Sequence, residues 1–74
     1  MYYSKEYKTR KQMFRGILRA LKKIGIILTS DDRAYDIILC TCHFEYSGRR
    51  DIEINSTVTV LIFENRWAIE GAEI

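Results

Sequence analysis

The chain has 74 residues, of which 47% are apolar and 30% are charged, and it contains no proline and four glycines. This length allows one domain, near the lower limit at which a single core is stable, and the apolar fraction excludes a disordered chain. No apolar run approaches the about 20 residues that a membrane-spanning helix needs.

The net charge of +2 conceals an uneven distribution of charges along the chain. Residues 1–30 carry eight Lys or Arg and one Glu, a balance of +7. Residues 31–74 carry four Arg and nine Asp or Glu, a balance of −5. Such asymmetry indicates an acidic partner for the basic part. Because there are two cysteines and no apolar export segment near Met1, we expect a reducing, cytoplasmic compartment.

A single amphipathic helix is predicted over residues 4–25. Ser4 is a candidate N-cap, and Gly25 can adopt the left-handed conformation that ends a helix. The apolar residues recur at the spacing that places them on one helical stripe. They are Phe14, Ile17, Leu18, Leu21 and Ile24.

After the helix, the apolar period changes to two, which predicts three antiparallel strands. Their expected ranges are residues 35–46, 52–63 and 66–70. In the first of them, Ile38, Cys40, Cys42, Phe44 and Tyr46 would share one face. The segment 47–51 contains Gly48 and has the length of a hairpin loop. Residues 26–29 fit either a short strand or a loop that crosses the core.

These elements indicate an α+β domain over residues 1–74, with residues 1–3 open to fraying. The expected architecture is one N-terminal amphipathic helix packed on a three-stranded antiparallel meander, in the order α-β-β-β. The side chains expected in the core are Phe14, Ile17, Leu21, Ile38, Cys40, Ile54, Val58, Val60 and Trp67.

Seven basic side chains are expected on the helix face opposite the apolar stripe, with no acid among them. An uninterrupted row of Lys and Arg is the electrostatic footprint expected for phosphate backbones. The plainer interpretation is a solvated outer face. The candidate binding residues are Lys8, Lys11, Arg15, Arg19 and Lys22.

Chemistry-bearing motifs are few. The segment Cys40-Thr41-Cys42-His43 suggests a metal site, but zinc takes four ligands, and the chain has no third cysteine and no second histidine. Strand alternation would place the two cysteines on one face, as small core residues, and His43 on the other. No glycine-rich phosphate loop or paired-carboxylate motif appears. We therefore expect no metal, no cofactor and no enzymatic activity.

The function expected is that of a small non-enzymatic protein that binds the phosphate backbone of nucleic acid. The alternative is a protein-binding inhibitor or adaptor, of the viral or mobile-element accessory type, that docks on an acidic or β-edge partner. Because the core is small and the chain around Trp67 to Ile74 would form an apolar edge, a homodimer through the C-terminal strand or through the open sheet face is also expected. A membrane partner is not expected, since the core requires the apolar stripe of the helix.

Overall fold

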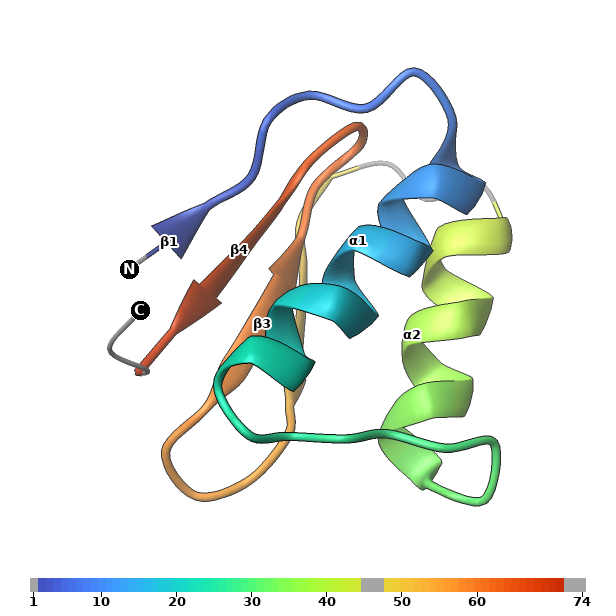
Figure 1. Cartoon of the computed structure of the whole chain (residues 1–74). Coiled ribbons are helices and arrows are strands. Elements are labelled where there is room, and N and C mark those ends of the chain that lie inside the picture. The colour runs from blue at the N-terminus through green and yellow to red at the C-terminus, as the bar shows by residue number, and fades with distance from the viewer. Residues whose placement is uncertain (1, 45–47, 72–74) are drawn as a thin grey trace.

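The computed structural model describes residues 2–44 and 48–71, which form two helices and one sheet (Figure 1). The helices are α1 (Arg10–Lys23) and α2 (Arg33–His43). The strands are β1 (Tyr2–Tyr3), β2 (Arg50–Glu53), β3 (Thr59–Ile62) and β4 (Trp67–Glu70). The predicted α+β class is confirmed, but there are two helices rather than one.

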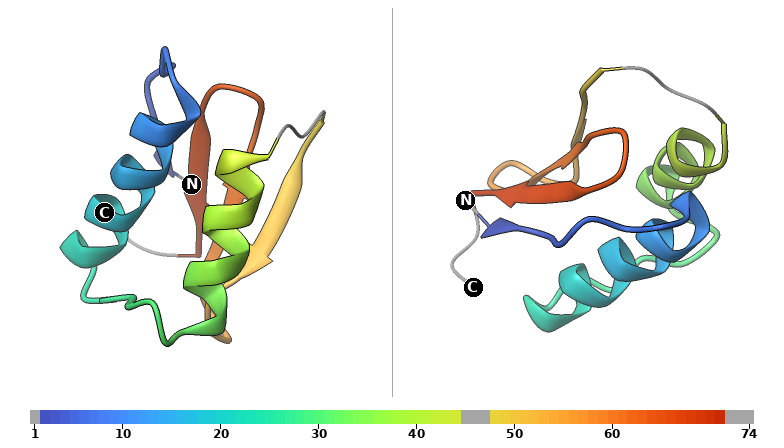
Figure 2. Two further views of the ribbon diagram at one scale, coloured as in Figure 1. Left: turned by 90° about the vertical axis from the view of Figure 1, so that its right-hand side faces the viewer. Right: turned by 90° about the horizontal axis from the view of Figure 1, so that it is seen from above.

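All neighbouring strands of the sheet are antiparallel, in the order β1-β4-β3-β2. Strands β2, β3 and β4 form a three-stranded meander as expected, but its first strand is Arg50–Glu53 rather than residues 35–46, and β1 adds a short fourth strand. Both helices pack on the same face of the sheet, so the molecule has two layers (Figures 1 and 2). Residues 2 and 3, which the sequence leaves open to fraying, pair with Ile69 and Ala68 of β4.

Helix α1 begins later than predicted, because Thr9 rather than Ser4 is its N-cap. The Thr9 side chain accepts a hydrogen bond from the Gln12 N–H at 3.2 Å. Ser4 serves the sheet instead: its Oγ accepts from the Trp67 N–H at 2.9 Å. At the other end, Gly25 has φ of +89° and its N–H donates to Lys22, as predicted for a left-handed helix end.

The predicted strand over residues 35–46 is wrong, because most of this segment is helix α2. The segment fits both the strand period of two and the helical period. Its buried residues, Ile38, Thr41 and Cys42, stand at the i, i+3, i+4 spacing of one helical face. As an 11-residue helix, α2 packs against α1, and this packing helps to bury the face that carries these residues. Tyr46 lies outside the described residues.

The predicted strand over residues 52–63 is also wrong in its continuity, since a turn divides it into β2 and β3. Asn55 makes the turn: its Oδ1 accepts hydrogen bonds from the N–H groups of Thr57 and Val58, both at 2.9 Å. Asparagine favours such turns because its side chain satisfies the backbone two and three residues further on. The segment 26–29, open between strand and loop, lies outside any helix or strand.

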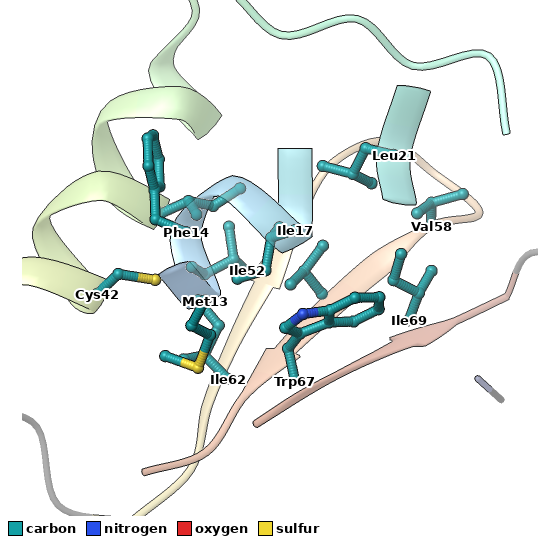
Figure 3. Packing of buried hydrophobic residues seen from close by; sticks show 12 residues of the cluster. Met13, Phe14, Ile17, Leu21, Cys42, Ile52, Val58, Ile62, Trp67 and Ile69 are labelled. Atoms are coloured by element: carbon teal, nitrogen blue, oxygen red, sulfur yellow. The ribbon is translucent and has the colours of Figure 1, made fainter. Parts of the chain in front are cut away.

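The core lies between the two helices and the inner face of the sheet (Figure 3). Seven of the nine residues predicted to be buried are buried: Phe14, Ile17, Leu21, Ile38, Val58, Val60 and Trp67. Ile54 is only partly buried, where β2 gives way to the turn. Cys40 is exposed because a helix turns it away from the core, and Cys42 takes the buried position.

The predicted apolar edge around residues 67–74 is wrong for the strand it contains, and residues 72–74 lie outside the described residues. Strand β4 lies between β1 and β3, because the N-terminal residues pair with it. Among the described residues, the outer strands of the sheet are therefore β1 and β2. Neither helix in the described part of the chain has both the length and the apolar character that crossing a membrane would require.

Candidate functional site

Of the five candidate residues, four lie on α1, whereas Lys8, which was predicted on the same helix, precedes it. All five candidate residues are exposed to solvent: Lys8, Lys11, Arg15, Arg19 and Lys22. We call these five side chains the cationic face. Within residues 2–44 and 48–71, the one salt bridge joins Arg49 to Asp51, so none of the five is neutralised by a described carboxylate.

A hollow of about 290 Å³ opens beside this helix, and we call it the basic pocket. Its walls are Lys5, Tyr7, Gln12, Arg15 and Arg19. Three cations therefore surround one depression, together with an amide and a phenol ring. Arginine keeps its charge at every physiological pH and presents a planar set of donors that suits phosphate and carboxylate oxygens.

The chain segment before α1 supplies one wall of the basic pocket. It is fastened to the sheet by two backbone hydrogen bonds, from Ser4 N–H to Trp67 O at 2.8 Å and from Tyr7 N–H to Asn65 O at 2.7 Å. The Lys5 ammonium lies 5.5 Å from the centre of the Tyr7 ring, within the range of a cation–π contact. Lys5 is thus held beside the helix by structure outside the helix.

Tyr7 forms the wall by lying against the one glycine of α1. Gly16 is buried, and a Cβ there would overlap the Tyr7 hydroxyl and stand 2.8 Å from its ring carbon Cζ. The same hydroxyl accepts a hydrogen bond from Trp67 Nε1 at 3.4 Å. Gly16 therefore admits the tyrosine between the helix and the sheet, which fixes the position of the pocket wall.

The pocket brings together only part of the predicted site. Arg15 and Arg19 line it, whereas Lys8, Lys11 and Lys22 remain exposed outside its lining. Sequence reasoning did not single out Gln12, which points into the hollow from the first turns of α1. A glycine at the centre of a strongly amphipathic helix was the available signal that another segment approaches there.

Arg10, at the start of α1, has a structural role. Its guanidinium donates to the carbonyl oxygens of Thr41 at 2.8 Å, of Cys42 at 2.9 Å and of Glu64. Two of these acceptors belong to the last turn of α2, whose carbonyls have no partner within the helix. Arg10 therefore joins α1, the end of α2 and the β3–β4 turn.

The Cys40–His43 segment is arranged differently from the prediction, because it is helical. Cys40 and His43 are exposed, while Cys42 is buried. The His43 ring lies edge-on to Phe14, with 5.9 Å between ring centroids. Burial raises the pKa of the Cys42 thiol to about 11, against the smaller opposing effect of the Arg10 charge. The described residues contain no group of three His, Cys, Asp or Glu side chains able to hold a metal ion.

The cationic face and the basic pocket together form a surface of positive charge that attracts anions. No protein family, curated protein or solved structure matches this chain.

Proposed function

We propose that the protein binds nucleic acid through the phosphate backbone, with one phosphate in the basic pocket and its neighbours along the cationic face. The observation that carries this proposal is the convergence of Lys5, Arg15 and Arg19 on one hollow. Lys5 precedes α1, whereas Arg15 and Arg19 lie on it. A tertiary contact, rather than helix periodicity alone, therefore brings these cations together. Like charges held close repel one another, and a bound polyanion would relieve that repulsion.

The side chains favour contact with the backbone over recognition of bases. Lysines and arginines on one exposed face give affinity that does not depend on sequence, whereas base recognition needs side chains placed in a groove. In the described residues, each helix already packs on the sheet along its apolar side, and no helix projects from the body of the molecule (Figure 2). We infer that the protein binds many nucleic-acid sequences with similar affinity.

Gel-shift titrations with random-sequence single-stranded and double-stranded probes test the proposal. The affinity should fall with a log–log salt slope of about −0.7 to −0.9 per phosphate engaged. Reversing Arg15→Glu and Arg19→Glu should abolish binding to every probe, because the net charge of the cationic face falls from +5 to +1 and that of the basic pocket from +3 to −1. Both side chains are exposed, so thermal melting should be little changed.

A matched control changes the net charge equally elsewhere on the molecule. Arg33→Glu with Arg50→Glu makes the same change at two exposed arginines beyond α1, and it should leave most of the affinity intact. Equal loss in both double variants would show that only net charge matters and would contradict a site at the pocket. Failure of the wild-type protein to bind any probe at low salt would overturn the proposal and favour an acidic protein as the partner of this face.

We also propose a cytoplasmic location. Cys40 and Cys42 are both free thiols, and Cys40 is exposed. Exposed free thiols persist in reducing compartments and are oxidised or paired in export pathways. Immunolocalisation of the protein in its host, or fractionation into soluble and secreted material, tests this.

A further inference from the structure

The face of the sheet turned away from the helices carries two aromatic rings. Core residues of β3 and β4 alternate with Leu61 and Ala68, which therefore lie on this outer face. Tyr3 is paired with Ala68 across the β1–β4 ladder, so its ring lies on the same face. The Phe63 ring lies beside it, with 6.5 Å between the ring centroids and 29° between the ring planes. We call Tyr3 and Phe63 the aromatic pair.

The aromatic pair is open to solvent and carries a guanidinium. Tyr3 is 53% exposed, and in the described part of the sheet it is the one exposed large apolar side chain, while Phe63 is half-buried. The guanidinium carbon of Arg66 lies 5.6 Å from the centre of the Tyr3 ring and 5.7 Å from that of the Phe63 ring. One flat, delocalised cation therefore already lies over both rings.

Charge alone does not select the ligand of the aromatic pair. Asp51, which lies opposite Leu61 in the sheet, is paired with Arg49 at 2.7 Å. Three further exposed acids of the sheet and the β3–β4 turn offset the charge of Arg66, namely Glu53, Glu64 and Glu70. The choice of ligand must therefore come from the size of the exposed surface and from the faces of the rings.

The size of this surface favours a small flat ligand over a protein. Leu61 and Ala68 are already buried, so the aromatic pair supplies the exposed apolar surface of the described part of this face. Two such rings offer at most about 500 Å², whereas a stable protein interface buries about 800 Å² on each partner. A second copy of the chain would therefore have to bury polar surface as well, but a nucleobase stacks on one or two rings alone.

The aromatic pair adjoins the basic pocket through residues 3–5. Between the two sites, Ser4 donates its N–H to Trp67 O at 2.8 Å, and its Oγ accepts from the Trp67 N–H at 2.9 Å. The Cα atoms of Tyr3 and Lys5 are at most about 7 Å apart, since two residues of chain span no more. The rings and the pocket are thus close enough to be reached by one nucleic-acid strand.

We propose that the aromatic pair stacks on unpaired bases, so that the nucleic acid bound at the basic pocket is single-stranded. This inference rests on the proposed function and narrows it. In a duplex the bases are stacked inside the helix and a protein side chain does not reach their faces. In a single strand the bases turn outwards and stack on aromatic rings and on arginine planes. Every base has such a face, so the stacking tolerates any sequence, as the backbone contacts do.

Fluorescence anisotropy with two labelled strands of about ten nucleotides tests the proposal. One is a thymidylate oligonucleotide, and the other has the same sugar–phosphate backbone without bases. The wild-type protein should bind the strand with bases at least about fivefold more tightly, because each stacked base contributes that factor or more. Tyr3→Leu keeps an apolar side chain but removes the aromatic face. It should remove most of this difference by weakening only the strand with bases.

Two further variants separate stacking from a general effect of substitution. Tyr3→Trp retains an aromatic face and should retain the preference for the strand with bases. Phe44→Leu removes a ring that is 70% exposed at the C-terminal end of α2, away from the aromatic pair. It should leave the preference unchanged.

The outcomes distinguish this inference from the proposed function. Equal binding of the two strands by the wild type would overturn the inference and leave the proposed function standing, whereas failure of both strands to bind would overturn both. Equal weakening of both strands by Tyr3→Leu would also overturn the inference, because Tyr3 would then only position the basic pocket. A homodimer through this face would cover the rings. A dimer that persists with the oligonucleotide bound, and that Tyr3→Leu dissociates, would show that a second copy occupies the face instead.

Discussion

Gly16 is the residue at which α1 accommodates a second segment of the chain. A glycine in the interior of a helix costs about 1 kcal/mol relative to alanine. Here it leaves room for the Tyr7 ring, whose hydroxyl also accepts a hydrogen bond from Trp67. The local cost is therefore offset by a contact between residues that are distant in sequence.

We expect Gly16→Ala to destabilise the fold, although alanine is the better helix former. The added methyl group must displace Tyr7, and such overpacking costs about 1–3 kcal/mol, which exceeds the propensity gain. In a Tyr7→Ala background the added Cβ meets only Trp67 Nε1, at 3.3 Å, so the same substitution should stabilise by up to about 1 kcal/mol. Urea unfolding of the four proteins in this double-mutant cycle measures both values. The same sign in both backgrounds would contradict the contact.

Cys42 should make stability depend on pH in the alkaline range. Burial raises the pKa of its thiol from an ordinary 9.0 to about 11, so the folded state favours the protonated form. This contribution is complete below pH 9 and is lost as the pH rises towards 11. Unfolding free energies measured across that interval should fall less steeply in Cys42→Ala than in the wild type. Cys40→Ala, which removes an exposed thiol, should retain the wild-type slope.

At the scale of elements, α2 depends on α1 for its C-terminal cap. The Arg10 guanidinium satisfies carbonyl groups at the end of α2 and in the β3–β4 turn. We expect Arg10→Met to cost about 2–3 kcal/mol, since a charged hydrogen bond is lost and part-buried carbonyls are left unpaired. Arg10→Lys should recover part of this, because an ammonium cannot reach all three acceptors in the same geometry. Equilibrium urea titration gives both values. An unchanged free energy of unfolding in Arg10→Met would refute the capping role.

The elements that the sequence predicted well are those with one dominant period. The apolar stripe of α1 continues from Phe14 to Ile24, and the helix lies where that stripe indicates, except for the first six and the last two predicted residues. In α2, Ile38, Cys40 and Cys42 alternate while Ile38, Thr41 and Cys42 also fit a helix. Only the packing of α2 on α1 decides between these periods, and that packing is not local information. The division of residues 52–63 was visible in Asn55, a turn residue inside an alternating run.

In the candidate site, too, only the part that depends on a local period could be predicted. Helix periodicity is enough to place Arg15 and Arg19 on the exposed face, because each turn of a helix fixes the direction of the next. The positions of Lys5 and Tyr7 depend on β1 pairing with β4, and a two-residue strand has no recognisable pattern. The pocket could therefore be predicted on its helical side only.

At the scale of the whole molecule, the homodimer stays a prediction with one remaining route. The β4 edge is covered by β1, which leaves, of the two predicted routes, the sheet face opposite the helices. On that face Leu61 and Ala68 are buried already, at 1% and 0% exposure, whereas Tyr3 is 53% exposed. Light scattering at tens of micromolar should give twice the monomer mass, and Tyr3→Lys should restore the monomer. A wild-type monomer at that concentration would remove the prediction.

The pairing of β1 with β4 also determines when the basic pocket can form during synthesis and folding of the chain. Ser4 and Trp67, which it brings together, are 63 positions apart in the chain. Contacts of such separation form late and slow a fold, because a long loop must close first. On a ribosome both helices emerge before Trp67, so Tyr7 has no indole to hold it and Lys5 has no fixed place beside Arg15. A nascent chain would carry the charges of α1 without the pocket, and full affinity would arise only when the last strand has left the exit tunnel.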